Sequence, residues 1–153
     1  MDSILSLCET LPDMAFKAGD VLLPEGSRTG FLYVLISGKV EILKGDFQVD
    51  TASQPGAVFG EISVLLDMPH MATVRALTPT RVYRIERASG FLNAHPEIAL
   101  ELARLLARRL NRVTNYLVDL KRHFGGVTGA LIAAGIEDQE SVQESGDSSP
   151  HLQ

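Results

Sequence analysis

Gly60 and Glu61 stand immediately before a short apolar run, Ile62 to Leu66, that the segment Asp67–Pro69 brings to an end. This pattern predicts a short helix with a glycine in front of it. The first backbone N–H groups of a helix have no partner within it, and their partial positive charge suits one phosphate group. A carboxylate would repel that phosphate, so we expect Glu61 to accept a hydrogen bond from a neutral hydroxyl, such as that of a ribose. A phosphate and a ribose hydroxyl together indicate a nucleotide.

The run from Phe59 to Val74, FGEISVLLDMPHMATV, resembles the phosphate-binding cassette of cyclic nucleotide-binding domains. Such domains occur in bacterial catabolite activator proteins, protein kinase A regulatory subunits and cyclic nucleotide-gated channels. The match has no gap and is carried by Phe59, Gly60, Glu61, Ile62, Leu65, Pro69, Ala72, Thr73 and Val74. One position departs from the pattern: His70 stands where the family has an arginine that grips the cyclic phosphate. The resemblance covers roughly residues 11–124.

The resemblance implies a role for each matching residue. Gly60 and Ile62 would donate backbone N–H groups to the phosphate, Glu61 would accept from the ribose 2′-hydroxyl, and Ser63 and Thr73 would line the pocket. The long C-terminal helix of the family commonly offers a hydroxyl to the base, and Thr114 lies near that position. The expected ligand is cyclic AMP or cyclic GMP, with no further cofactor. The expected ligand-binding residues are Phe59, Gly60, Glu61, Ile62, Ser63, His70, Met71, Thr73 and Thr114.

Two readings remain open because of His70. Its imidazole either takes the place of the arginine or points to solvent from the turn at Pro69. The first reading favours a cyclic nucleotide sensor, and the intact Gly60–Glu61 pair supports it. The replacement of the arginine by His70 favours instead a degenerate domain that binds no nucleotide and serves as a dimeric interaction scaffold. The choice between adenine and guanine also stays open, because Met71 is neither the small residue nor the hydroxyl usual at its position.

Short β-strand patterns separated by glycine signals run from Met14 to Ile85, at a spacing that predicts an eight-stranded antiparallel jelly roll. Its barrel is expected over about residues 13–87, with a short helix before it and a long helix after it. The predicted strands are Met14–Lys17, Val21–Leu23, Phe31–Ser37, Lys39–Leu43, Phe47–Asp50, Ala57–Phe59, Ala72–Ala76 and Arg81–Ile85. Glycines at corners such as Gly38 are expected to adopt positive φ.

Helical periodicity marks both flanks of the barrel. A short amphipathic helix is predicted over Ser3–Leu11, with Cys8 as a buried small apolar residue. A long helix is predicted from Pro96 to Phe124, about 40 Å at ~1.5 Å per residue. Its second half places apolar residues at alternating spacings of three and four, the heptad pattern of a helix pair. We therefore expect a homodimer through Leu110, Val113, Leu117 and Leu120.

Composition excludes several classes of protein. The chain has 153 residues and a net charge of −5, so it has no general basic footprint for nucleic acid. The four histidines include no H-x-H pair and there is no G-x-S-x-G motif, so neither a metal enzyme nor a serine hydrolase is expected. No apolar run is long enough to span a membrane, and a single cysteine suits a reducing compartment, so the cytoplasm is expected.

Residues 125–153 differ in character from the predicted domain, residues 1–124. A short helix over Leu131–Ala134 is one expectation for this stretch. The last seventeen residues hold five acidic residues and no Lys or Arg, and we expect them to be disordered. No recognition helix for DNA follows the long helix, so the sensor is expected to act in trans on a separate effector protein.

Overall fold

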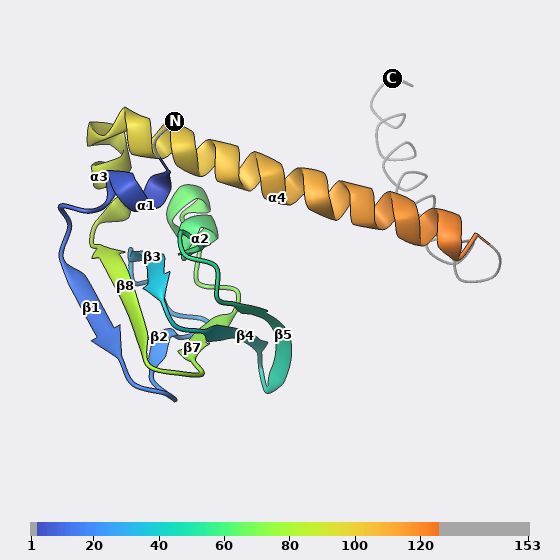
Figure 1. The fold of residues 1–153 in the computed structure, drawn as a ribbon, viewed down its shortest axis with the longest axis horizontal. Coiled ribbons are helices and arrows are strands. Elements are labelled where there is room, and N and C mark those ends of the chain that lie inside the picture. Colours follow the sequence, from blue (N-terminus) through green and yellow to red (C-terminus); the bar gives the residue numbers. More distant parts are fainter. Residues whose placement is uncertain (1–2, 126–153) are drawn as a thin grey trace, which may run out of the picture. The chain divides into compact units, whose positions relative to one another are not determined.

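The computed structural model describes residues 3–125 (Figure 1). The predicted features of residues 126–153 lie outside the described residues. The chain divides into two compact units, Met1–Arg104 and Leu105–Gln153. The first unit contains the strands and the predicted nucleotide site, except for Thr114.

Eight strands lie within the described residues, each at a predicted place. They are β1 (Asp13–Phe16), β2 (Val21–Leu23), β3 (Leu32–Ser37), β4 (Val40–Lys44), β5 (Phe47–Ala52), β6 (Val58–Phe59), β7 (Thr73–Ala76) and β8 (Thr80–Ile85). They form two four-stranded sheets, in the orders β1-β8-β3-β6 and β2-β7-β4-β5, and every pairing is antiparallel. The predicted jelly roll is therefore confirmed.

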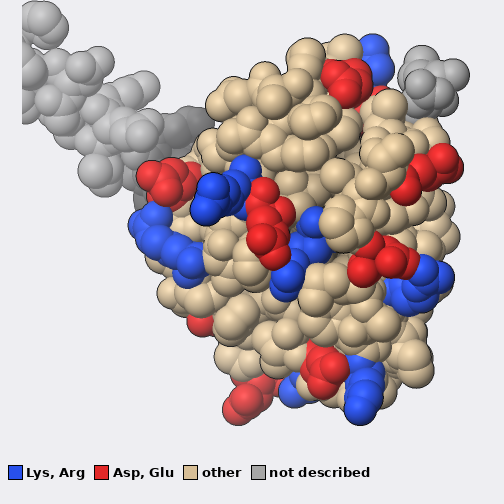
Figure 2. Space-filling view, turned by 90° about the vertical axis from the view of Figure 1, so that its left-hand side faces the viewer, with Lys and Arg blue, Asp and Glu red and all other residues tan. Residues whose placement is uncertain are grey.

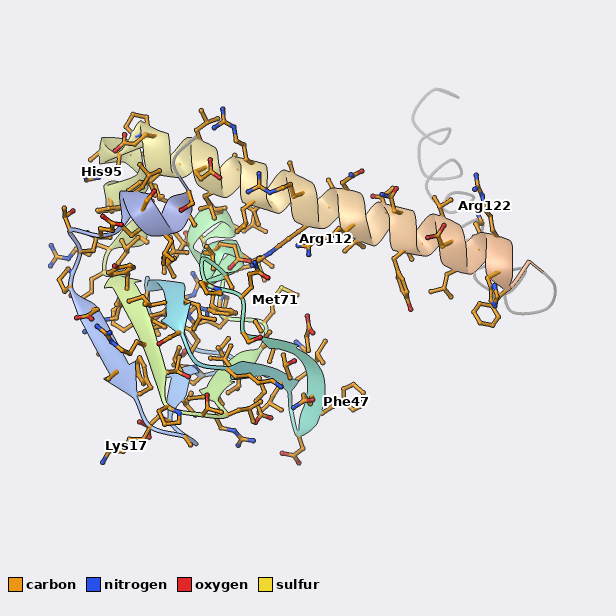
Figure 3. All side chains as sticks on the ribbon, viewed as in Figure 1. Lys17, Phe47, Met71, His95, Arg112 and Arg122 are labelled. Atoms are coloured by element: carbon orange, nitrogen blue, oxygen red, sulfur yellow. The ribbon has the colours of Figure 1, made fainter. Side chains whose placement is uncertain are left out.

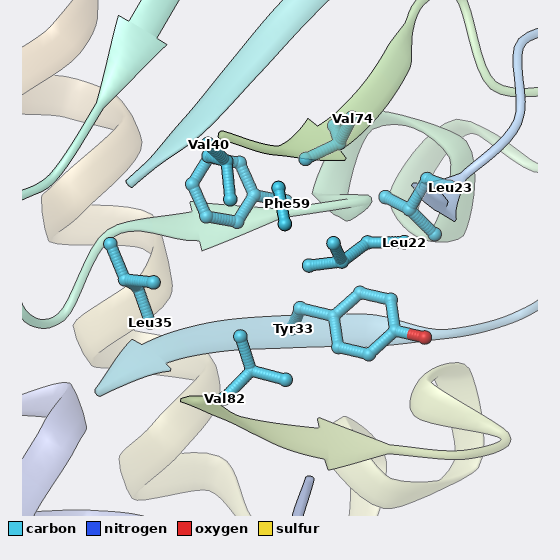
Figure 4. Close-up of a cluster of buried hydrophobic side chains, with 9 residues drawn as sticks. Leu22, Leu23, Tyr33, Leu35, Val40, Phe59, Val74 and Val82 are labelled. Atoms are coloured by element: carbon cyan, nitrogen blue, oxygen red, sulfur yellow. The ribbon is translucent and has the colours of Figure 1, made fainter. Parts of the chain in front are cut away.

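The core lies where the inward faces of the two sheets meet (Figure 4). Side chains from both sheets contribute, because alternate residues of a strand point to the same face. The buried cluster consists of Leu22, Leu23, Tyr33, Leu35, Val40, Phe59, Val74, Ala76 and Val82. The rings of Phe16 and Phe31 meet Tyr33 edge to face, with centroids 5.9 and 6.2 Å away. Phe59 ties this core directly to the start of the predicted site.

The helix α1 (Ile4–Leu7) is shorter than predicted. Ser3 caps it by accepting a hydrogen bond from the backbone N–H of Ser6. The chain then turns, and the N–H of Leu11 donates to the carbonyl of Cys8 at 2.9 Å instead of continuing the helix. This turn leaves Cys8 fully buried, and burial raises the pKa of its thiol to about 11. The expectation of a buried cysteine is confirmed.

Three further helices follow the strands or interrupt them. The helix α2 (Glu61–Leu66) is the predicted short helix of the site. The helix α3 (Ala88–Ala94) was not predicted, because Ser89-Gly90 at its start is a turn signal. The helix α4 (Pro96–His123) matches the predicted long helix to within one residue. In the first unit, Ile98 and Leu102 of α4 are buried. No helix among residues 3–125 is both long and apolar enough to span a membrane.

Candidate functional site

The start of the candidate site is fixed by Gly60, which follows β6 and precedes α2. Its φ of 91° lies in the left-handed region, where an L side chain is strained. A Cβ at this position would also collide with the backbone carbonyl of Phe31. Only glycine therefore permits this close approach, and it aims the first turn of α2. Phe59, one residue earlier, is 6% exposed and packs in the barrel core.

The acidic residue of the site is buried. Glu61 is the first residue of α2 and is only 7% exposed. A buried carboxylate needs hydrogen-bond donors or a charged partner. Its neighbour Ile62 is 45% exposed, so the first turn of α2 presents both an inner and an outer face. The structure thus buries an acidic residue in the first turn of α2.

Two contacts hold the far end of α2. The hydroxyl of Ser63 donates to the carbonyl of Met68, which closes the turn after the helix. Asp67 ends the helix with a φ of 50°, and Arg28 donates both to its carbonyl, at 3.1 Å, and to its carboxylate, at 3.2 Å. Both ends of α2 are therefore set by contacts with other parts of the chain.

His70 is buried, with 5% of its surface exposed, so the reading in which it points to solvent is wrong. Its Nε2 lies 2.8 Å from the hydroxyl oxygen of Thr29. Its backbone N–H donates to Ser27, and its carbonyl accepts from Gly26. Burial lowers the pKa of the imidazole, which favours the neutral ring. In this structure the ring is engaged with Thr29.

The remaining predicted residues lie in three settings. Thr73 begins β7, and its hydroxyl accepts from the backbone N–H of Glu25 at 3.0 Å. Met71, labelled in Figure 3, lies between α2 and β7 and is 51% exposed. Thr114 is exposed on α4, in the second unit. The structure therefore brings together the predicted residues between 59 and 73. Their roles with a ligand stay predictions.

Sequence reasoning missed the loop between β2 and β3, residues 24–31. This loop supplies the carbonyl of Phe31 against Gly60, the guanidinium of Arg28 and the hydroxyl of Thr29. In the sequence, Glu25-Gly26-Ser27 indicates only a turn. Nothing local connects it with His70, which follows about forty residues later. Only the tertiary structure reveals that this loop holds the site in place.

Charges of both signs lie side by side on the face shown in Figure 2. Arg81 pairs with Asp13, and Arg84 pairs with Glu86 at 2.7 Å. Arg84 also lies 4.7 Å above the ring of Phe31.

Within residues 3–125, no three His, Cys, Asp or Glu side chains are grouped so that they could hold a metal ion. The chemistry available at the site is therefore hydrogen bonding by N–H groups, a carboxylate and an imidazole.

Comparison with known proteins identifies relatives of both bacterial and eukaryotic origin. A "CRP-like cAMP-activated global transcriptional regulator" of Mycobacterium tuberculosis is 33% identical over 124 residues, 77% of this chain and 55% of the regulator. A "cAMP-dependent protein kinase regulatory subunit" of Yarrowia lipolytica is 29% identical over 84 residues, 55% of this chain and 22% of the subunit. The crystal structure of the Thermus thermophilus catabolite activator protein superposes with a TM-score of 0.60 at 27% identity, covering 76% of this chain and 56% of that chain.

The chain spans about half the length of the bacterial regulator that it matches, 55%. The likeness lies in the part that the barrel and the candidate site occupy. A family model described as the cyclic nucleotide-binding domain matches residues 13–93, which run from β1 into α3. The ungapped cassette, the two-sheet jelly roll and this match agree, and the chain belongs to the cyclic nucleotide-binding domain family.

Proposed function

We propose that this domain binds cyclic AMP or cyclic GMP at residues 59–74 and acts as a sensor of that nucleotide. The observation that carries the proposal is the junction of β6 and α2. There, Gly60 adopts a conformation that only glycine tolerates, and Glu61 is buried directly behind it. A carboxylate in the first turn of a helix that can seat a phosphate can accept a hydrogen bond from a neutral ribose hydroxyl, which supports a nucleotide as the ligand.

The chemistry of each polar group in the proposed site suggests the part of the nucleotide that it would bind. The backbone N–H groups of Gly60 and Ile62 would donate to the cyclic phosphate. The carboxylate of Glu61 would accept from the ribose 2′-hydroxyl. Ser63, Met71 and Thr73 would stand around the nucleotide. Two relatives are named for cyclic AMP activation and dependence, which supports cyclic AMP as the first ligand to test.

His70 is the residue on which affinity depends in this proposal. Its ring would part from Thr29, 2.8 Å away, and turn to the phosphate. The bound anion would then favour the imidazolium. This exchange has an energetic cost, because it gives up a hydrogen bond and brings a charge into a buried position. We therefore expect weak binding at pH 7.5, micromolar or worse.

The proposed output of the sensor is the apolar face of α4. Leu110, Val113 and Leu117 are 67%, 55% and 56% exposed, an arrangement that favours association with another helix. The proposed association is a homodimer through these residues and Leu120. A separate effector protein would bind the surface of that dimer. Thr114 would lie near the nucleotide base. The single free cysteine suits the cytoplasm as the place of action.

One observation favours a second candidate, a degenerate domain that binds no nucleotide and serves as a dimeric scaffold. The imidazole that replaces the arginine of the family is 95% buried, since only 5% is exposed, and it is bonded to Thr29. In this candidate Thr29 and His70 form a purely structural contact that has replaced the phosphate grip.

Calorimetric titration of cyclic AMP and cyclic GMP into the full chain, with 5′-AMP as control, separates the two candidates. The sensor predicts saturable binding of at least one cyclic nucleotide and none of 5′-AMP. The variant His70→Arg restores a bidentate donor and should bind more tightly. Absence of binding by wild type at millimolar nucleotide, combined with binding by His70→Arg, would establish the scaffold, because the pocket would then be intact but unused.

A further inference from the structure

A separate pocket of about 210 Å³ lies where the end of α2, the loop of residues 24–31 and the start of α3 meet. Its polar lining includes Arg28, Asp67, Arg87 and Ser89, above apolar surface from Val64 and Ala88. Of the predicted nucleotide-binding residues, this pocket includes Ser63, whose hydroxyl is already bonded to Met68. The charged residues of this pocket, Arg28, Asp67 and Arg87, are therefore not among the predicted nucleotide-binding residues.

The charges around this pocket do not cancel. Its lining has two arginines and one aspartate. Asp67 compensates Arg28, which donates to it at 3.2 Å. The backbone carbonyl of Arg87 accepts from the N–H of Phe91 at 3.1 Å, but its guanidinium has no hydrogen bond, ion pair or ring contact with any residue between 3 and 125. One guanidinium charge therefore remains available at the wall of the pocket.

The backbone is strained at this same place. Within the described part of the chain, Asp67 and Arg87 are the two residues other than glycine with positive φ, each at 50°, and both line the pocket. Glycine would adopt this conformation without strain. The side chain of Asp67 is held by its contact with Arg28. The side chain of Arg87 has no such contact within the described residues. Strain of this kind clusters at ligand-binding sites.

We propose that this pocket binds a small anion with a single carboxylate or phosphate group, held between the guanidinium groups of Arg87 and Arg28. A guanidinium offers a planar fork of donors that matches both groups. Pockets for drug-sized ligands hold about 300–1,000 Å³, so the occupant is smaller. The anion would contact α2, the helix that begins with Glu61, from a side other than the nucleotide.

The test is an amide NMR titration of the full chain at pH 7.5 with inorganic phosphate, then with acetate. Sodium chloride at matched ionic strength controls for screening. Saturable shifts are expected at Arg28, Asp67, Ser89 and Gly90 with at least one of the two probes, and the tighter probe identifies the preferred group. Arg87→Gln should weaken this binding at least about tenfold, the effect of one lost charged hydrogen bond.

Two further variants keep the result interpretable. Arg87→Gly removes the guanidinium and the backbone strain together, so it should raise the melting temperature and weaken anion binding. Arg112→Gln changes an exposed arginine on α4 and should bind both probes as wild type does. The proposal is overturned by shifts that never saturate, by equal shifts with chloride, by unchanged binding in both Arg87 variants, or by saturable shifts confined to residues 60–62. Nucleotide binding itself is measured separately by calorimetry, so failure of this proposal and failure of the proposed function can be told apart.

Discussion

Glu61 is the residue on which the proposed specificity for a ribose depends, because it is an acid that is only 7% exposed at the start of α2. Changing Glu61 to Ala should weaken cyclic nucleotide binding by ~1.5–3 kcal/mol, the range for a hydrogen bond to a charged group. Calorimetry with 2′-deoxy cyclic AMP provides the control. The deoxy ligand should bind wild type less tightly but bind the variant as well as the parent ligand does. An equal loss for the deoxy ligand in both proteins would remove Glu61 from the site.

His70 should make affinity depend on pH with a defined sign. A cyclic phosphodiester keeps one negative charge near neutrality, so the titrating group is the imidazole. The bound anion raises the histidine pKa in the complex, whereas burial lowers it in the free protein. Affinity should therefore strengthen as pH falls from 8 through 6, and level off only below the lowered pKa of the free protein.

Calorimetry at pH 8 and pH 6, on wild type and on His70→Arg, checks this dependence. The arginine variant should bind more tightly at both pH values and lose the pH dependence, because arginine stays charged throughout. A flat wild-type profile, or no gain from arginine, would leave His70 outside the phosphate site.

The same residue should make folding stability depend on pH in the absence of ligand. Burial lowers the pKa of His70 in the folded state below its ordinary value of 6.5, so folding favours the neutral ring. The resulting stability is present above pH 6.5 and is lost as pH falls through the lowered folded pKa. His70→Gln can still bond to Thr29 but cannot titrate. Urea denaturation at pH 7.5 and 5 should show a larger loss for wild type than for this variant, and parallel losses would contradict the account.

At the scale of the element, the orientation of α2 depends on Gly60. Gly60→Ala should cost about 2–5 kcal/mol of folding free energy, from left-handed strain of ~1–2 kcal/mol and overpacking of ~1–3 kcal/mol. Gly19 is a matched control, since it has the same φ of 91° with nothing within 4 Å of an added Cβ. Gly19→Ala should show the strain alone. Denaturant unfolding measures the free energy of unfolding of both variants. Equal losses of stability would mean that the backbone at Phe31 moves to make room for the added Cβ at little cost.

Local patterns predicted the elements well where one signal dominated. The strands from Val21–Leu23 to Thr80–Ile85 stand at their predicted places because glycine turns separate alternating or continuous apolar runs. The helix α1 ended early because a local turn, in which the N–H of Leu11 donates to Cys8 at 2.9 Å, replaces its continuation. The helix α3 was missed because Ser89-Gly90 is a turn signal, whereas in the folded chain the N–H of Ala88 at its start donates to the distant Gly30 at 3.1 Å.

At the scale of the whole molecule, the proposed dimer rests on the exposed apolar face of α4. Changing Leu110 and Leu117 together to Asp puts four charges across the seam of two chains, which should cost several kcal/mol of association and yield a folded monomer. The double variant Asn111→Asp and Asn115→Asp adds the same charge off the seam and should stay dimeric. Light scattering measures the mass, and a wild type already monomeric at micromolar concentration would refute the dimer.

The sequence by itself determined the family, the jelly roll and the cluster of residues from 59 to 74, because these depend on short-range spacing and on residue types. Only the tertiary structure decided how His70 is held, since its partners Gly26, Ser27 and Thr29 lie about forty residues away in the chain. The same holds for Arg28 on Asp67 and for Phe31 against Gly60. Contacts between distant segments leave no periodic trace in either segment, so the loop that fixes the site could be found only once the chain was folded.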